Sequence, residues 1–414
     1  MMNTPKLRFK DNNGQEFPEW NFPELHEIAV KVKDKNKNYE NNTVLTNSAT
    51  LGIINQSEYF EREIVTEKNL SGYYIVNVDD FVYNPRISTP APVGPVSRNL
   101  YRQGIMSPLY TVFRFSTGNL NYFEQIFKSK CWHIYIKSVA NTGARHDRIS
   151  ITDKLFFSLP IIFPSLLEQQ KIATFLSAID TKITHTNKQI ALLKQYKKGV
   201  MQQIFSQQLR FKDDNGQKFP EWERLPIGVK VDLLCGYPFD YSDISKDVSN
   251  TRLLRGINIT EGWIRHSHKI DRYYHGSTDK LKKYRLQTND LVIGMDGSKV
   301  GKNSALITPL DARALLVQRV ARLRTNSLVS VQFIFQQINS IKFHAYVDRI
   351  NTSSAIPHIS AKQINNFHIG FPNLLEQQKI VSFLSAIDTK IQSAKSSLAA
   401  LKSYKQGLLQ QMFI

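Results

Sequence analysis

The sequence contains few cysteines and no long apolar run. Its two cysteines, Cys131 and Cys235, are interpreted as free thiols in a reducing compartment rather than as a disulfide framework. No segment reaches the roughly 18 consecutive apolar residues that are typical of a membrane-spanning helix. The first residues, MMNTPKLRFKDNNGQ, lack the apolar stretch of a secretory signal. We therefore expect a cytoplasmic protein that does not associate with a membrane.

Acidic residues are also scarce relative to basic ones. The 414 residues include 35 Asp and Glu against 54 Lys and Arg, which gives a formal net charge of +19. A balance this basic favours a polyanionic partner, and nucleic acid is the first candidate. The hydrophobic fraction of 41% is sufficient for real cores, and the length suits two or three domains.

No catalytic or metal-binding motif is recognisable. GSKVGKNS (297–304) resembles a phosphate loop, but three residues instead of four separate its glycines, and asparagine follows the lysine where Ser or Thr is required. NPRIST (84–89) lacks the second proline and the aromatic residue of the amino-methyltransferase loop. His266 and His268 have no acidic or cysteine partner at metal-binding spacing. We expect no catalytic residue, no metal site and no cofactor in this chain.

The most informative feature that is present is an internal repeat. PSLLEQQKIATFLSAIDTKI (164–183) recurs as PNLLEQQKIVSFLSAIDTKI (372–391), with three differences. After its first proline each copy is rich in helix formers, and no further proline or glycine occurs until Gly199 and Gly407, which predicts two helices of about 40 residues. Apolar residues recur in steps of four and three, as in a heptad seam. The predicted seam consists of Ile172, Leu176, Ile179, Ile183, Ile190 and Leu193 in the first copy, and Ile380, Leu384, Ile387, Ile391, Leu398 and Leu401 in the second.

A second repeat indicates how the two helices are arranged. LRFKDNNGQEFPEW (7–20) recurs as LRFKDDNGQKFPEW (209–222), directly after the first helix. The repeat unit is therefore a helix followed by an LRFKD segment and a variable region, and the N- and C-termini fall between the second helix and the first LRFKD segment. Joining the two termini would give a closed ring of two similar halves. We predict that the helices pair antiparallel. The alternative is that they are unrelated surface helices, each buried on its own domain.

Two variable regions, about 21–162 and 223–370, separate the repeats. TVFRF (111–115) and RVARL (319–323) are predicted strands, and 122–136 and 331–347 are predicted amphipathic helices, so both regions are interpreted as α+β. DDFVYNPR (79–86) aligns with NDLVIGMD (289–296), which indicates a common plan. The predicted fold class is therefore α+β, with two globular domains separated by two long helices in an antiparallel coiled coil, arranged as a pseudo-two-fold circular repeat. The predicted parts are 1–162 (domain 1), 163–208 (helix 1), 209–370 (domain 2) and 371–414 (helix 2).

Basic residues cluster unevenly, with more net positive charge in 223–370 than in 21–162. Arginine can read base edges in a bidentate fashion and lysine mostly contacts phosphate, but each single arginine here fits a backbone contact or a solvated position better than a base reader. A glycine-containing basic turn at 297–304 suits contact with a DNA backbone. The candidate DNA-binding residues are Arg145, His146, Arg148, Arg252, Arg255, Arg265, Lys269, Lys282, Lys283, Arg285, Ser298, Lys299 and Lys302.

These motifs carry a family resemblance. A variable domain followed by FPSLLEQQKIATFLSAID, then a second domain followed by FPNLLEQQKIVSFLSAID, resembles the DNA specificity subunit of type I restriction–modification systems. The two FPEW segments and NDLVIGMDGSKVGK support the resemblance, which extends over essentially the whole chain. It implies that the variable regions are target recognition domains for the two parts of a split, asymmetric DNA sequence, and that the helices set the spacing between them.

The resemblance also implies partners. Two methyltransferase subunits, which bind S-adenosylmethionine, and ATP-dependent restriction and translocase subunits would dock on a chain that is not itself an enzyme. Two other functions remain open from the sequence: a coiled-coil scaffold that binds proteins, with incidental basicity, and a stand-alone methyltransferase or nuclease. Salt-dependent binding to a defined duplex would favour DNA recognition over the scaffold. Methyl transfer by the purified chain alone would favour a stand-alone methyltransferase.

Overall fold

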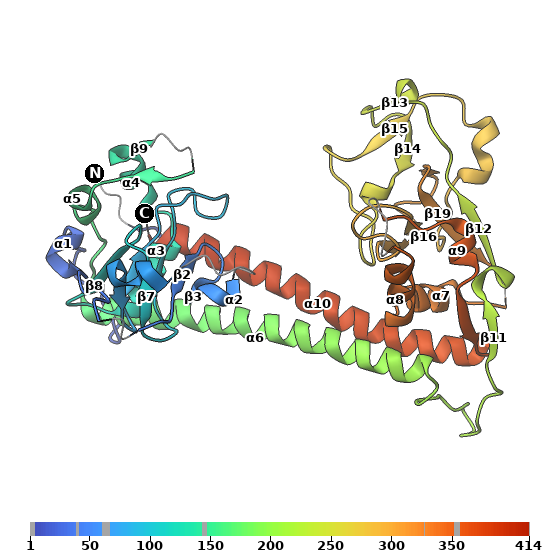
Figure 1. Ribbon diagram of the computed structural model, residues 1–414, viewed down its shortest axis with the longest axis horizontal. Coiled ribbons are helices and arrows are strands. Elements are labelled where there is room, and N and C mark those ends of the chain that lie inside the picture. Colours follow the sequence, from blue (N-terminus) through green and yellow to red (C-terminus); the bar gives the residue numbers. More distant parts are fainter. Residues whose placement is uncertain are drawn as a thin grey trace. The chain divides into compact units, whose positions relative to one another are not determined.

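The chain divides into two compact units that share the two long helices. The computed structural model describes residues 5–38, 41–59, 67–142, 147–326, 328–351 and 357–413. Unit 1 comprises Met1–Asn187 with Ser396–Ile414, and unit 2 comprises Lys188–Lys395. The helices α6 (Leu166–Phe205) and α10 (Leu374–Met412), of 40 and 39 residues, each run from one unit into the other (Figure 1). Their lengths agree with the sequence prediction.

Unit 1 is built on a four-stranded antiparallel sheet in the order β1-β8-β5-β6. Two small two-stranded sheets, β2-β3 and β4-β7, flank it, and β9-β10 form a short ribbon. The strands are β1 (Ala29–Lys31), β2 (Leu45–Ser48), β3 (Gly52–Asn55), β4 (Tyr74–Val76), β5 (Phe81–Tyr83), β6 (Val96–Arg98), β7 (Gly104–Met106), β8 (Thr111–Phe115), β9 (Asn141–Thr142) and β10 (Ile149–Ser150). The helices besides α6 are α1 (Leu25–Ile28), α2 (Gln56–Tyr59), η1 (Glu67–Gly72), α3 (Leu120–Lys128), α4 (His133–Val139) and α5 (Asp153–Phe157).

Unit 2 contains a matching antiparallel sheet in the order β12-β19-β16-β17 and a second sheet, β13-β15-β14-β18. Its strands are β11 (Glu223–Pro226), β12 (Val231–Cys235), β13 (Ile244–Ser245), β14 (Thr251–Leu254), β15 (Arg272–Tyr274), β16 (Leu291–Gly294), β17 (Ser304–Leu306), β18 (Leu315–Leu316), β19 (Val320–Thr325) and β20 (His368–Phe371). The helices besides α10 are η2 (Ile227–Val229), η3 (Tyr241–Asp243), η4 (Gly256–Asn258), η5 (Asp279–Tyr284), α7 (Val331–Ile338), α8 (Ile341–Ile350) and α9 (Ala361–Asn365).

An ion pair on a buried aspartate shows that the two main sheets share one plan. In unit 1 the Asp80 carboxylate, which has no exposed side-chain surface, accepts a 2.6 Å bond from Arg114 Nε. In unit 2 Asp290 accepts the corresponding 2.7 Å bond from Arg324 Nε. Each aspartate immediately precedes the strand that pairs with the strand of its arginine, β5 with β8 and β16 with β19. The alignment of DDFVYNPR with NDLVIGMD therefore corresponds to a structural equivalence.

Both predicted amphipathic helices prove to be pairs of shorter helices. Residues 122–136 fall in α3 and α4, which are separated at Ser129–Trp132, and residues 331–347 fall in α7 and α8. In the second case Ser340 caps α8, since its hydroxyl accepts a hydrogen bond from the Phe343 amide at 3.3 Å. The apolar period continues across each break, so the break is not visible in the pattern of hydrophobicity.

The start of each long helix packs on the end of the other. In unit 1 Ile172, Leu176 and Ile179 of α6 share a core with Leu408, Leu409, Met412 and Phe413 from the end of α10. In unit 2 Ile380, Leu384, Ile387 and Ile391 of α10 share a core with Val200, Met201, Ile204 and Phe205 from the end of α6. Each core also includes residues of the adjacent domain, so the helices pack on each other and on their domains at once. The predicted antiparallel pairing is confirmed.

The remaining predicted seam residues lie nearer the middle of the helices. Ile190 is buried, whereas Ile183, Leu193, Leu398 and Leu401 are only partly buried. Two lysines that interrupt the apolar pattern have specific partners across the helix pair. Lys405 donates to Asp180 at 2.5 Å, and Lys197 donates to Asp388 at 2.8 Å.

The two aspartates connect the helices to their domains. Gln125 of α3 donates to Asp180 at 3.0 Å, and Gln336 of α7 donates to Asp388 at 3.2 Å. Burial alone would raise the pKa of Asp180, but the hydrogen bond from Lys405 and the charge of Lys128 hold that pKa below its usual value. The same lysine–aspartate–glutamine arrangement thus occurs once in each unit.

The two sequence repeats bind each other, which explains why they recur together. In unit 1 the buried Glu168 carboxylate accepts hydrogen bonds from Arg8 at 2.8 Å and from the Trp20 indole at 2.9 Å. In unit 2 the buried Glu376 accepts them from Arg210 at 3.0 and 3.2 Å and from Trp222 at 2.9 Å. The LRFKD and FPEW motifs supply the arginine and the tryptophan, and the LLEQQ motif supplies the glutamate.

The position of the chain ends follows the same plan. In unit 2, where the chain is continuous, the Leu209 amide donates to the Gln203 carbonyl at 3.1 Å. In unit 1 the Leu7 amide donates to the Gln411 carbonyl at 3.2 Å, although residues 7 and 411 are near opposite ends of the sequence. The first LRFKD segment therefore follows α10 in space as the second follows α6 in sequence, and the predicted circular repeat is confirmed.

The buried glutamates give a first prediction. We expect Glu376→Gln to lower the free energy of unfolding by about 2 kcal/mol, because charged hydrogen bonds to Arg210 and Trp222 are lost in a buried site. Glu221→Gln is the matched control, since Glu221 contacts the same Arg210 at 3.1 Å but its side chain is 90% exposed. Its loss should stay below about 0.5 kcal/mol. Chemical denaturation of the full chain measures both, and equal losses would contradict a structural role for the buried contact.

Candidate nucleic-acid interface

A basic groove in unit 2 brings together four of the predicted DNA-binding residues. Arg255, Arg265, Ser298 and Lys299 line this concavity of about 790 Å³. Its wall also includes Trp263, Asn303, Gln318 and Arg319, which sequence reasoning did not select. The side chains come from separate segments: the η4 region, the loop that follows it, the glycine turn after β16 and the turn between β18 and β19.

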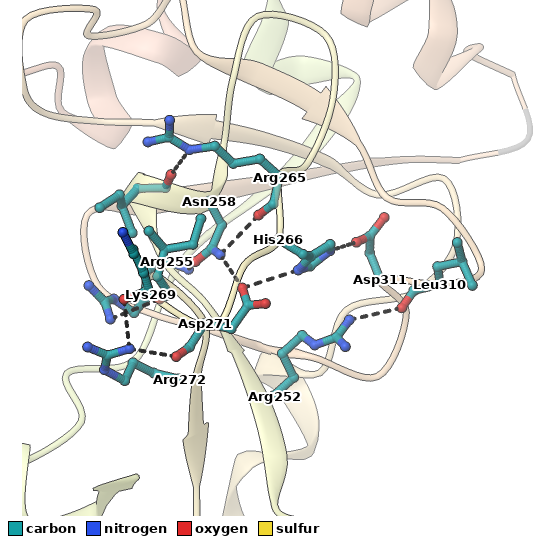
Figure 2. A network of polar contacts seen from close by, with 12 residues as sticks. Arg252, Arg255, Asn258, Arg265, His266, Lys269, Asp271, Arg272, Leu310 and Asp311 are labelled. Carbon is teal, nitrogen blue, oxygen red and sulfur yellow. Dashed lines mark hydrogen bonds and ion pairs between the residues drawn. The ribbon is translucent and has the colours of Figure 1, made fainter. Parts of the chain in front are cut away.

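A buried asparagine positions two of the arginines. Asn258, at the end of η4, is fully buried. Its amide Nδ2 donates to the Arg265 carbonyl at 3.2 Å and to Asp271 at 2.9 Å, and its Oδ1 accepts from the Arg255 amide at 3.2 Å. Figure 2 shows Asn258 at the centre of this network, between Arg255, Arg265 and Asp271. The backbone that carries both arginines is therefore fixed by one side chain.

The guanidinium groups around this network donate to carbonyl oxygens rather than to carboxylates. Arg265 Nε donates to the Ile257 carbonyl at 2.7 Å, and Arg255 donates to the Ile270 carbonyl at 3.5 Å. Arg272 donates to the carbonyls of Asp271 and Lys269 at 2.7 and 3.2 Å. Burial and the nearby charge of Arg272 lower the pKa of Arg255. In the part of the chain that the structure describes, these guanidinium groups have no carboxylate partner, and such groups attract an anion with many acceptors, such as phosphate.

A histidine on the far side of the network links two loops. His266 lies between Asp271 and Asp311, at 3.3 and 2.7 Å (Figure 2). The contact with Asp311 was not predictable from the sequence, since the two residues are 45 positions apart. Among the described residues, no group of three or more His, Cys, Asp or Glu could hold a metal ion.

The glycine turn at 297–301 places Lys299 in the groove but not the following Lys302. Gly297 and Gly301 have φ angles of +88° and +68°, which allow the tight turn that places Ser298 and Lys299 in the groove. Lys299 pairs with Glu261 at 2.7 Å, and both side chains are more than half exposed, so a phosphate can replace the carboxylate. Lys302 pairs with Asp348 at 2.8 Å and is not part of the groove lining.

The other predicted residues of unit 2 lie elsewhere. Arg252 and Arg285 line a second concavity of about 340 Å³, together with Arg313. Arg252 donates to the Leu310 carbonyl at 3.3 Å, and its buried Nε has no partner among the described residues. The exposed residues Lys269, Lys282 and Lys283 lie outside both concavities, and the Lys283 ammonium lies 5.0 Å from the Tyr284 ring centre.

In unit 1 the candidates are only partly described. Arg145 and His146 lie outside the described residues, and Arg148 is half-buried, with its backbone paired to that of Arg86. A concavity of about 890 Å³ in this unit is lined by Arg98, Lys128, Lys130 and His133, among others. Burial lowers the pKa of His133 to about 4, with the charges of Lys137 and Lys130 adding to the effect, so that its ring is neutral at pH 7.

The comparison with known proteins places the chain in a family. Residues 4–195 and 246–403 match the family described as type I restriction modification DNA specificity domain. The chain belongs to this family. It is 26% identical over 322 residues to the type I restriction enzyme MjaVIII specificity subunit of Methanocaldococcus jannaschii, which covers 75% of this chain and 73% of that protein. It is 31% identical over 196 residues to the EcoAI specificity subunit of Escherichia coli, which covers 46% of this chain and 32% of that protein.

Solved structures show the same fold. The S subunit of a type I restriction–modification system from M. genitalium aligns with a TM-score of 0.58 at 15% identity, over 100% of this chain and 99% of that one. A chain from a study of complex assembly and conformational transition of the type I R-M system aligns with a TM-score of 0.57 at 14% identity, over 96% and 98%. The predicted fold class and family are confirmed. None of the described helices is long and apolar enough to cross a membrane.

Proposed function

We propose that this member of the specificity family recognises a bipartite, asymmetric DNA sequence, one part with each variable domain. Residues 1–162 and 209–370 would be the two target recognition domains, and 163–208 and 371–414 the helices that space them. The observation that carries this proposal is that the two variable domains share an equivalent main sheet but differ in the side chains that they expose. Asp80–Arg114 and Asp290–Arg324 hold equivalent sheets, whereas the groove lined by Arg255, Arg265 and Arg319 belongs to unit 2.

Repeated exposed apolar residues support docking of two copies of the same partner. Leu167 and Leu375 occupy equivalent positions on α6 and α10 and are 66% and 62% exposed. Tyr196 and Tyr404 are likewise equivalent and are 54% and 56% exposed. Large apolar side chains exposed on a helix suit a protein interface. Because each type occurs once per unit, they suit two methyltransferase subunits, with restriction and translocase subunits completing the complex.

The activities of the complex are assigned to those partners. In this proposal the chain is non-catalytic and acts in the cytoplasm, where its DNA target is. S-adenosylmethionine and ATP would be bound by the methyltransferase and translocase subunits. The candidate residues of the two variable domains, including Arg148 and the arginines of the unit 2 groove, would contact the duplex.

Salt dependence of DNA binding gives the second prediction. With its partners present, the chain should bind a defined duplex with an affinity that falls by about 10³-fold between 50 and 200 mM salt, if about six phosphates are contacted. The reason is that Lys and Arg release condensed counterions from the DNA. Equilibrium titration against the mapped target and a scrambled duplex provides the measurement. Binding that is insensitive to salt, or equal for all sequences, would favour a protein-binding scaffold instead.

A further inference from the structure

The turn between β18 and β19 has an unusual residue at its tip. The Val320 amide donates to the Val317 carbonyl at 3.2 Å, which closes a four-residue turn with Gln318 and Arg319 at its centre. Both side chains are exposed and line the basic groove. Arg319 has a φ angle of +65°, in the left-handed region. The sequence assigned Arg319 to the predicted strand 319–323, whereas β19 begins at Val320.

The left-handed conformation of Arg319 is energetically unfavourable for a residue with a side chain. Glycine adopts it freely and asparagine tolerates it, but other residues do so at a cost, and such strain is enriched at functional sites. The equivalent turn in unit 1 joins β7 to β8 and is closed by a 3.0 Å bond from the Tyr110 amide to the Ser107 carbonyl. Its central residues are Pro108 and Leu109, and neither has a positive φ angle. The equivalent turns thus present polar side chains in unit 2 and apolar ones in unit 1.

A carboxylate orients the Arg319 side chain. Nη1 donates to Asp296 Oδ2 at 3.0 Å, and Asp296, which lies just after β16, also lines the groove. The Arg319 side chain is 66% exposed, against 28% for Asp296. One part of the guanidinium is therefore held by a half-buried acid, and its remaining donors have no partner among the described residues. This differs from Arg255 and Arg265, which donate to backbone carbonyls.

These features separate two roles within the groove. An arginine that contacts phosphate gains nothing from an adjacent carboxylate, which would repel the phosphate as well. An arginine that reads a base needs a fixed orientation, because bidentate recognition of guanine O6 and N7 requires two donors in one plane. A glutamine side chain can likewise make paired hydrogen bonds to adenine N6 and N7. The Gln318–Arg319 pair provides both kinds of reader at one tip.

We propose that the Gln318–Arg319 turn is the base-reading element of unit 2. Arg319, oriented by Asp296, contacts a guanine in the major groove of the second half-site, and Gln318 contacts an adjacent adenine. Arg255 and Arg265, which donate to backbone carbonyls rather than to a carboxylate, contact the phosphates on either side. This inference rests on the proposed function, since it assigns residues to a DNA target.

The test uses the full chain with its partner subunits and a duplex library in which the second half-site is randomised. Arg319→Gly removes the side chain and also relieves the left-handed strain, so the variant should fold at least as well as the parent. Arg319→Lys keeps the charge and loses the planar fork. Both should reduce the preference for guanine at one base pair by roughly tenfold or more, and leave the other positions of the half-site unchanged.

Two matched variants separate base reading from general electrostatics. Arg313→Gly removes an exposed arginine of the same unit that also has a left-handed φ, +73°, but lies outside this groove, and it should leave the preference at that base pair unchanged. Arg265→Ala should weaken binding to all sequences alike and lower the salt slope by about one. Asp296→Asn should reduce the guanine preference without weakening overall binding, because it removes a negative charge that faces DNA.

The outcomes are distinct. If Arg319→Lys keeps the full guanine preference, or if Arg319→Gly weakens every sequence equally, Arg319 is a phosphate contact and the assignment is overturned. If the parent complex selects no sequence at all, the proposed function fails together with this inference. Loss of preference at a single base pair in both Arg319 variants, with the Arg313 variant unchanged, supports the assignment.

Discussion

A chain in which residues 21–162 replace residues 223–370 is expected to recognise an inverted repeat of the first half-site. Both domains meet the long helices through equivalent contacts, so the first domain can occupy the frame of the second. Gln169 accepts a 2.9 Å bond from the Asn119 amide, and Gln377 accepts the same bond from the Ser330 amide. Gln125 and Gln336 also approach equivalent aspartates. Sequencing the modified bases in DNA from cells that express the hybrid with its partners provides the measurement.

The size of the effect makes this prediction decisive. One half of the target should change completely, which corresponds to the several kcal/mol, about 1–3 per base pair, that separate a matched from a mismatched half-site. The half-site read by the original 21–162 should stay the same, and the unmodified chain serves as the control. A hybrid that is folded and active but alters both halves would show that the two domains do not read DNA independently.

The organisation of the chain was predictable because its two structural motifs each occur twice in the sequence. Two copies of LLEQQKI and two of LRFKD fix the repeat order, and their spacing predicts the long helices and the antiparallel pairing. The partners within that plan were not predictable. Nothing in a single sequence connects Arg8 to Glu168, 160 residues away, or identifies Asp388 as the reason for a lysine in the apolar pattern at Lys197.

The candidate interface was predictable only in part. Clusters of arginine indicated Arg255 and Arg265, and the glycine turn indicated Ser298 and Lys299, all of which line one groove. Arg319 was missed because its backbone conformation, not its residue type, distinguishes it, and RVARL has the composition of a strand. Lys302 illustrates the reverse case, since its charge is paired with Asp348 outside the groove. Charge counts identify a basic region, and the backbone decides which side chains share a surface.

A fragment of residues 1–208 is expected to replace the whole chain as a homodimer. Its helix carries both surfaces that the pairing requires, since the end of α6 resembles the end of α10. Val200, Met201, Ile204 and Phe205 would take the positions that Leu408, Leu409, Met412 and Phe413 occupy in unit 1. An isologous two-fold interface would then repeat each contact twice. The dimer carries the first domain twice, so it should recognise the same inverted repeat as the hybrid chain.

A charge pair makes the dimer testable at one contact. In the fragment, Lys197 would take the place of Lys405 beside Asp180, which is the 2.5 Å pair of the whole chain. Lys197→Glu should therefore repel Asp180 and weaken dimerisation, whereas the exchanged pair Asp180→Lys with Lys197→Glu should restore it in part, since Lys128 also lies 3.2 Å from Asp180. Because pairing becomes bimolecular, DNA binding should strengthen as protein concentration rises, unlike that of the full chain. Analytical ultracentrifugation and duplex titration measure both, and a folded fragment that stays monomeric at tens of micromolar would show that the helix ends are not interchangeable.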